Sequence, residues 1–524
     1  MKMRMRWILW LPLSLLVCAL PLAGQLPHAQ EDPLARMRAA SQNAETCSAT
    51  ETSLCAEAAP KIIASALGPS PLYENLRRLT DEIGGRPSGS PAMAAAIKWG
   101  VDAFHAAGVS SVHTESYTIP ANWSEGATHL DVLSPMPFPV RLVSIAWAPA
   151  TPATGITANV VDVGNGKDED FARVGAAAHG AIVLVHSDVL QTLDGLFAEY
   201  MEAPGIVTRS VNAGAAAILW MSSREQLLLY RHINTMDGTI DRLPQAIVAR
   251  EDAERLARFL AAGQALRVKL DIPNHISGPV EQQNVVAEIR GREKPNEYVV
   301  VGAHLDSWEL GTGALDNGCN AALVIEAARD ILATGLVPRR SIRFVLFSGE
   351  EQGMLGSWAY VRAHRAEMDR VAAAIAIDEG IGRITGFSLG GRRDTEAALR
   401  NILQPVESWG VTQHTPDAIW GTDHFDFMLE GVPTLLANQD AANYMVNYHA
   451  ASDTLDKVDI REVKFNTAIV AITAFGIAES PEKFGARQSR AEIEAMMKQT
   501  GLAQQLQGVG AWSMWESGAR GRQK

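Results

Sequence analysis

Two adjacent glutamates, Glu350 and Glu351, stand near the end of the segment RFVLFSGEEQG, residues 343–353. The apolar part of this segment is typical of a buried strand, and ligands of α/β proteins gather at the carboxyl ends of such strands. Because the side chains of adjacent residues diverge, the two carboxylates cannot easily serve as equivalent ligands of one ion. We expect one to bind a metal ion and the other to take a proton from a water molecule.

Three other segments place polar side chains at predicted strand ends or in the loops just after them: VVVGAHLDSWELGTGALDNG, AIAIDEG and YMVNYHAASDT. They supply His304, Asp306, Asp316, Asp378, Glu379, His449 and Asp453. Histidines combined with several carboxylates form the ligand set of dinuclear zinc sites. In an extended segment residues i and i+2 point the same way, so Asp306 is predicted to accept the second N–H of His304. The glycines around Asp316 allow a close backbone approach, so that this carboxylate can bridge two metal ions.

Fully apolar segments such as EYVVVGAH and SIRFVLFSG alternate with helical patterns in the second half of the chain. Strands without a polar face, each followed by a helix, predict a parallel or mixed sheet that is covered on both sides. The middle of the chain instead carries many short β-runs and few candidate catalytic groups. The sequence therefore predicts an α/β fold, a mixed β-sheet sandwiched by helices, that is interrupted by a β-rich insertion.

The N-terminus has the layout of a secretory signal peptide, with Lys2, Arg4 and Arg6 before an apolar run and small residues at its end. A signal anchor is the alternative, but the run is short and contains prolines. Export to the periplasm or the extracellular space is therefore expected, and it permits a disulfide between Cys47 and Cys55. Cys319 is predicted to be a small buried residue.

The predicted domain boundaries follow from these changes in hydrophobic pattern and composition along the chain. They are a signal peptide at 1–24, a loosely ordered lead-in at 25–58, the first part of the α/β domain at 59–124, the insertion at 125–275, the second part with the metal site at 276–480, and a C-terminal helix and tail at 481–524.

The 524 residues carry a formal charge of -13. This charge argues against nucleic acid or an anionic membrane as the main partner.

Five motifs in order resemble the co-catalytic zinc exopeptidases, which include bacterial zinc aminopeptidases and the carboxypeptidase Q branch: GAHLDSWELGTGALDNG, GEEQG, AIDEG, WGTDHFDFMLEGVP and YHAASDT. The resemblance covers roughly residues 70 to 480 and implies the zinc-exopeptidase fold with a protease-associated domain as the insertion. It implies two zinc ions, with His304 and Asp378 on one, Glu351 and His449 on the other, and Asp316 as the bridge. Glu350 would be the general base and Asp306 the carboxylate that orients His304.

The same resemblance places Tyr444 or Tyr448 near the oxyanion, and Asp423 with His424 at the substrate pocket; a core tyrosine and a helix N-cap are the respective alternatives. It implies hydrolysis of dipeptides or short peptides, and a possible homodimer. Leu315 departs from the aminopeptidases, which often carry a second aspartate there. SWELGTGA favours the carboxypeptidase Q branch while TDHFDF favours the aminopeptidases, so the direction of cleavage stays open. Manganese or cobalt would also suit these ligands.

Two other classes of function compete with this interpretation. Gly386–Gly390 fits the G-x-S-x-G elbow of serine hydrolases around Ser388, but glycines fall where the required helix would begin. A noncatalytic binding protein that has lost its metals would show substitutions at ligand positions, whereas all five ligands and the base are of competent types. The sequence contains no H-E-x-x-H, which excludes the simplest single-zinc protease.

Overall fold

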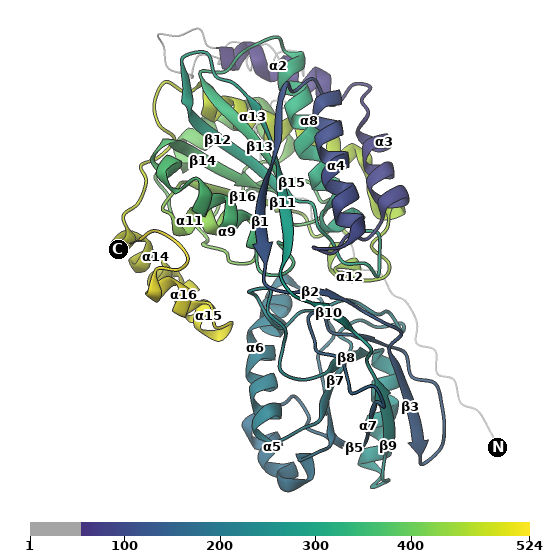
Figure 1. Ribbon diagram of the computed structural model, residues 1–524. Coiled ribbons are helices and arrows are strands. Elements are labelled where there is room, and N and C mark those ends of the chain that lie inside the picture. Colours follow the sequence, from purple (N-terminus) through teal and green to yellow (C-terminus); the bar gives the residue numbers. More distant parts are fainter. Residues whose placement is uncertain (1–53, 524) are drawn as a thin grey trace, which may run out of the picture. The chain divides into compact units, whose positions relative to one another are not determined.

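The computed structural model describes residues 54–523 (Figure 1). The predicted signal peptide, nearly all of the lead-in and Cys47 lie outside this range, so the Cys47–Cys55 disulfide stays a prediction. Cys319 is fully buried, as predicted. Within residues 54–523, no helix combines the length and the apolar character that crossing a bilayer requires.

The apolar strands form a mixed seven-stranded sheet, which confirms the predicted fold class. In spatial order its strands are β1 (Ser111–Ile119), β11 (Val280–Ile289), β13 (Arg340–Phe347), β12 (Lys294–His304), β14 (Val371–Ala376), β16 (Thr434–Gln439) and β15 (Ile384–Ser388). The four strands from β13 to β16 run parallel, and the outer strands pair antiparallel. The carboxyl ends of the parallel strands therefore meet at one edge of the sheet.

Helices cover both faces of this sheet because its strands alternate apolar side chains between two cores. On β12, Val299 and Val301 belong to one core, and Val300 belongs to the other. The first core is completed by α2 (Leu54–Ala66), α3 (Leu72–Arg77), α4 (Pro91–Ala106), α8 (Cys319–Ala333), α10 (Glu396–Leu403) and α13 (Ile460–Glu479). The second is completed by α9 (Leu355–Ala363) and α11 (His424–Leu429), and Figure 1 shows these two helices grouped apart from the first set.

A second seven-stranded sheet is built from the middle of the chain. Its spatial order is β3 (His129–Ser134), β9 (Arg267–Asp271), β5 (Ile156–Asp162), β6 (Ile182–Val185), β7 (Ala217–Met221), β8 (Gln245–Val248) and β4 (Leu142–Ser144). One face packs against α7 (Arg250–Ala261), and the other packs against α5 (Asp168–Val174) and α6 (Leu193–Asn212). The chain enters this part after β2 (Asn122–Ser124) and leaves it before β10 (His275–Ser277), and these two strands pair with each other.

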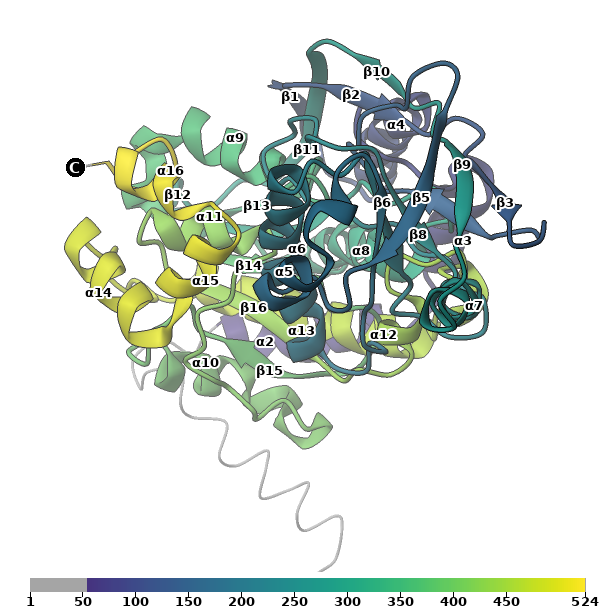
Figure 2. The same ribbon diagram turned by 90° about the horizontal axis from the view of Figure 1, so that it is seen from below.

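The C-terminal residues form three helices, and the prediction of one helix and a tail was wrong. The helices are α14 (Arg490–Thr500), α15 (Leu502–Gly508) and α16 (Trp512–Ser517). Gly501 and Gly510 have φ angles of 81° and 75°, which glycine adopts readily, and they separate the helices. The helices pack on α11, and α15 also contacts α6 (Figure 2).

Arg520, which follows α16, joins this C-terminal segment to the main sheet. Its guanidinium pairs with Asp426 of α11 at 2.7 Å and donates to the Gly353 carbonyl at 3.2 Å. The remaining short elements are η1 (Arg78–Ile83), η2 (Gly175–Ala178), η3 (Ala314–Gly318), η4 (Arg365–Arg370), η5 (Gln404–Trp409), α12 (Tyr444–Asn447) and η6 (Leu455–Lys457).

Candidate metal centre

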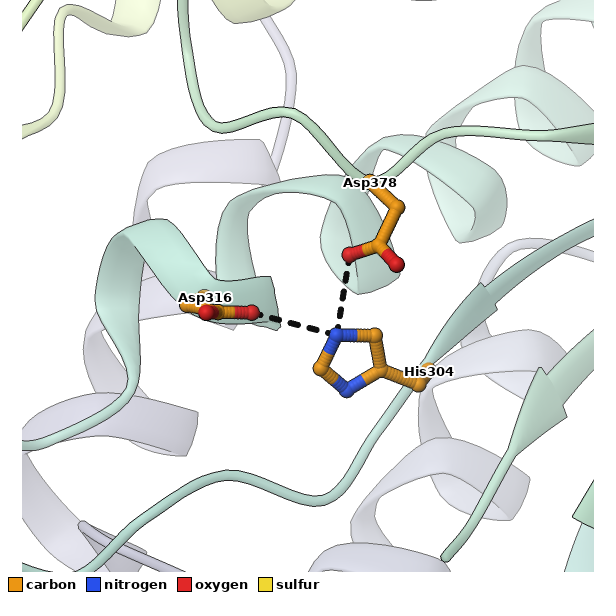
Figure 3. A group of neighbouring side chains, drawn as sticks. All are labelled: His304, Asp316 and Asp378. Carbon is orange, nitrogen blue, oxygen red and sulfur yellow. Dashed lines mark hydrogen bonds and ion pairs between the residues drawn. The ribbon is translucent and has the colours of Figure 1, made fainter. Parts of the chain in front are cut away.

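The five predicted ligands come together in two groups that share Asp316. The first group is His304, Asp316 and Asp378, and the second is Asp316, Glu351 and His449; the potential ligand atoms of each group lie within 4.8 Å of one another. His304 Nε2 is 3.1 Å from Asp316 Oδ1 and 2.9 Å from Asp378 Oδ1 (Figure 3). His449 Nε2 is 3.3 Å from Asp316 Oδ2 and 2.9 Å from Glu351 Oε2. Each oxygen of Asp316 thus faces a different histidine, as a bridging carboxylate requires.

The parallel strands explain why these residues meet. His304 ends β12, Glu351 follows β13 and Asp378 follows β14, so the three side chains lie at the same edge of the sheet. Asp316 lies in η3 between β12 and α8, and His449 follows α12. The preceding Leu315, where this chain departs from the aminopeptidases, is fully buried in the core.

The contacts of these side chains fit a bound cation. An imidazole nitrogen carries either one proton or one lone pair, so His304 Nε2 cannot satisfy two carboxylate oxygens at once. Glu351 is 6% exposed, and its Oε1 has no hydrogen-bond partner among the described residues. Buried carboxylates that converge in this way need a positive charge between them. Imidazole nitrogens with carboxylate oxygens form a donor set that suits zinc.

The side chains also perturb one another's protonation. Burial lowers the pKa of His449, but attraction to Glu351 and Asp316 outweighs burial and raises this pKa to about 9. Burial raises the pKa of Glu351 to about 7 and that of Asp378 to about 6. The pKa of His304 is raised as well, because attraction to Asp378 exceeds the effect of burial. Both histidines must therefore lose a proton before they can bind a metal.

Glu350 belongs to neither ligand group, although it lines the same cavity. Burial raises the pKa of its carboxyl well above the ordinary value, and Asp378 and Glu351 add to the shift. A carboxylate with a raised pKa accepts a proton more readily than an exposed one. The structure thus has Glu351 in a candidate ligand group and Glu350 outside both groups, on the wall of the same cavity.

Asp306 lies beside His304 through both its backbone carbonyl and its carboxylate. His304 Nδ1 lies 3.0 Å from the backbone carbonyl oxygen of Asp306, whereas the Asp306 carboxylate is 3.7 Å away. The strand ends at His304, so the extended geometry on which the prediction rested does not continue to Asp306. The carboxylate also accepts the backbone N–H groups of Glu350 and Glu351, each at 3.3 Å. It orients the turn that carries both glutamates.

Two further side chains hold the loop that carries Asp316. The buried carboxylate of Asp453 accepts the backbone N–H groups of Ala314, Leu315 and Asp316 at 2.9, 2.6 and 3.2 Å. Arg86 is fully buried and donates to carbonyls of the loop between β12 and η3, including those of residues 312 and 313 at 3.0 and 2.9 Å. Asp453 lies in the segment YMVNYHAASDT, whose sequence predicts a polar site residue there but no specific role for it. Nothing in the sequence around Arg86 indicates its role.

A cavity of about 90 Å³ opens onto the metal centre. Tyr444 and Tyr448 line it together with Glu379, and so does an apolar group from α6 and from the loops before α11 and β8: Leu193, Leu196, Phe197, Met236, Ile419 and Trp420. The hydroxyl groups of Tyr448 and Tyr200 of α6 are 3.2 Å apart. Thr422 lines the cavity, whereas Asp423 and His424 are buried and are not among the lining residues.

Ser388 has none of the surroundings of a nucleophile elbow. It is buried at the end of β15, and its hydroxyl donates to Asn438 at 2.8 Å. The next helix, α10, begins only at Glu396. The serine hydrolase alternative therefore lacks its required strand–turn–helix geometry.

Part of the chain matches a known peptidase family, and most of it is similar to known peptidases. Residues 284–474 match peptidase family M28. Carboxypeptidase Q of Rattus norvegicus is 29% identical over 410 residues, which cover 78% of this chain and 86% of the relative. The crystal structure of a peptidase M28 precursor from Shewanella amazonensis has a TM-score of 0.75 and 28% identity, and the match covers 82% of this chain and 98% of that one. A zinc aminopeptidase from Bacillus subtilis shares the fold, with a TM-score of 0.63 and 19% identity over 80% of this chain and 97% of that one.

Proposed function

We propose that this chain is an exported zinc metallopeptidase, an exopeptidase that uses two zinc ions to hydrolyse dipeptides and short peptides. Its residues 284–474 match peptidase family M28, and a carboxypeptidase Q matches most of its length. One observation supports the proposal above all others: two three-residue ligand groups share Asp316, with Glu350 beside them. The signal-like N-terminal pattern of the sequence supports export.

His304 and Asp378 would hold one zinc ion, Glu351 and His449 the other, and Asp316 both. Bound zinc supplies Lewis acidity, which lowers the pKa of a water molecule and polarises a carbonyl group. Glu350 takes a proton from the attacking water and passes it to the nitrogen of the leaving amine. Its raised pKa suits both halves of this transfer, because the same carboxyl group must first accept the proton and then give it up.

The cavity supports a small peptide as the substrate. The cavity opens onto the metal centre, and α6 supplies much of its apolar wall. An apolar wall next to the scissile bond favours an apolar side chain in the substrate. Tyr444 and Tyr448 line the cavity. The proposal includes a hydroxyl group of one of them that donates to the developing oxyanion, and it includes a homodimer.

Aminopeptidase activity is the second candidate. Glu379 is not a predicted ligand, yet it adds a carboxylate to the cavity wall. Such a group could pair with the free ammonium of a peptide substrate. Carboxypeptidase or dipeptidase activity remains the first candidate, since a carboxypeptidase Q matches 78% of this chain at 29% identity, whereas the zinc aminopeptidase from Bacillus subtilis is only 19% identical.

The test uses one free dipeptide, its N-acetyl form and its C-terminal amide, each with zinc-loaded protein and with a chelator. Release of free amino acid from the free and acetylated forms indicates a carboxypeptidase, and release from the free and amidated forms indicates an aminopeptidase. Cleavage of the free form alone indicates a strict dipeptidase. Hydrolysis that persists after the zinc is removed, or no hydrolysis of any form by zinc-loaded protein, would contradict the proposed function.

A further inference from the structure

A segment of the insertion reaches the metal centre and pairs with the backbone of a ligand. Residues 229–231, between β7 and β8, run antiparallel to residues 449–451. Arg231 donates its backbone N–H to the His449 carbonyl at 2.8 Å, and Ala451 donates to the Leu229 carbonyl at 3.1 Å. The His449 side chain lies across the same ladder, with Nδ1 at 3.1 Å from the Arg231 carbonyl oxygen.

This contact determines which nitrogen of His449 can bind a metal. When Nδ1 donates its proton to the Arg231 carbonyl, Nε2 carries the lone pair, and Nε2 is the atom that faces Glu351 and Asp316. His449 also has a φ angle of 57°, in the left-handed region that non-glycine residues seldom adopt. The ladder with the insertion helps to hold that conformation, so the ring direction of this ligand depends on the second sheet.

The side chain of Arg231 fixes the ladder in place. It is fully buried, and its guanidinium pairs with Glu125, which follows β2, at 2.6 Å and with Glu309. It also donates to the Ser144 carbonyl of β4. Glu309 lies in the loop between β12 and Asp316, so one guanidinium joins the insertion to the loop that precedes the bridging ligand. Loss of one partner would leave buried charges unpaired, which is strongly destabilising to the local arrangement.

We propose that Arg231 is a positioning residue of the metal centre, which makes the insertion an integral part of the zinc site formed by His449, Glu351 and Asp316. The inference rests on the proposed two-zinc function. It assigns the insertion a role in metal binding, in addition to the wall that α6 contributes to the cavity.

The experiment measures zinc affinity of metal-stripped, full-length protein by competition with a chromophoric chelator. Wild type should bind two zinc ions, and His449→Ala should lose one. Arg231→Met should weaken one of the two sites by about 10-fold to 100-fold, the usual effect of removing an outer partner of a metal ligand, while the other site is unchanged. Arg250→Met is the matched control, because Arg250 is a partly buried arginine that donates to carbonyls of residues 187 and 222 within the insertion.

A double variant separates positioning from general damage. Adding Arg231→Met to His449→Ala should cause no further loss at the remaining zinc site, because the ligand that Arg231 positions is already gone. If Arg231→Met does not fold in the zinc-free state, Glu309→Gln tests the same link and should weaken the same site by a smaller factor. Equal zinc affinities for Arg231→Met and Arg250→Met, or a further loss in the double variant, would overturn the inference. Fewer than two zinc ions on wild type would instead overturn the proposed function.

Discussion

Replacing Asp453 by asparagine should weaken zinc binding without removing any ligand. Asp453 accepts three backbone N–H groups from residues 314–316, the segment that ends in the bridging Asp316. These donors belong to the peptide groups that direct the Asp316 side chain toward both histidines. The variant has nearly the same volume as the wild type, so it removes charge and one acceptor oxygen while the packing is kept.

The expected loss of zinc affinity follows from the hydrogen bonds that the variant removes. A hydrogen bond to a charged group contributes about 1.5–3 kcal/mol. The single amide oxygen of asparagine can accept at most two of the three N–H groups, so at least one bond is lost. A loss of about 1.5–3 kcal/mol corresponds to about a tenfold to a hundredfold change in an equilibrium constant. We expect the zinc affinity of Asp453→Asn to be about tenfold to a hundredfold lower than that of the wild type.

The assay is chelator competition at about pH 8, because burial raises the pKa of Asp453 to about 7 and the carboxylate must be ionised in the wild type. Asp456→Asn is the matched control, since that side chain is 69% exposed in the neighbouring η6. A folded Asp453→Asn protein whose zinc affinity stays within about threefold of the control, far below the loss of a charged hydrogen bond, would refute the reasoning.

Three other predictions follow from the site. Glu350→Gln should bind zinc like wild type but lose about 10²-fold to 10⁴-fold in kcat, whereas Glu351→Gln should lose one zinc ion; near-normal turnover by Glu350→Gln, followed by amino acid release, would exclude it as the base. Zinc affinity should rise as pH increases up to about 9, because the pKa of His449 is raised to about 9 and its proton competes with zinc at lower pH; chelator competition at several pH values checks this, and a flat profile would contradict it. Phe197→Ala should lower kcat/KM roughly tenfold for dipeptides with a large apolar side chain while Ala–Ala hydrolysis is kept, because Phe197 lines the cavity; equal losses for both substrates would show that Phe197 does not select side chains.

Four of the five ligands could be predicted because they stand at or just after an apolar strand or in a glycine-rich loop, whereas His449 follows the short helix α12. Parallel strands bring their carboxyl ends to the same edge whatever the rest of the chain does. His304, Glu351 and Asp378 follow this rule directly. The orienting role of Asp306 stays a prediction: its carboxylate lies 3.7 Å from His304 Nδ1, although the strand ends at His304 and the backbone carbonyl of Asp306 is nearer, at 3.0 Å.

The supporting residues could not be predicted in the same way. Arg86 and Arg231 hold the centre through contacts with residues 226 and 218 positions away, respectively, and no local pattern marks those pairs. The residue type does not indicate their role either, because a lone arginine in a loop is usually exposed. The sequence predicted one C-terminal helix where the structure has three, because the glycines that separate the helices resemble the composition of an irregular tail.

The contact between Arg520 and the Gly353 carbonyl affects the order in which the parts of the metal centre are held in place during synthesis. Glu350 lies on the turn that ends at Gly353, and the arginine that holds this turn comes 167 positions later in the chain. During synthesis, the sheet and all five ligands can leave the ribosome while the turn still lacks this support. A nascent chain would thus contain all five metal ligands before the turn that carries Glu350 and Glu351 is held in place, so a protein that stops shortly before residue 520 should bind zinc more weakly and lose turnover.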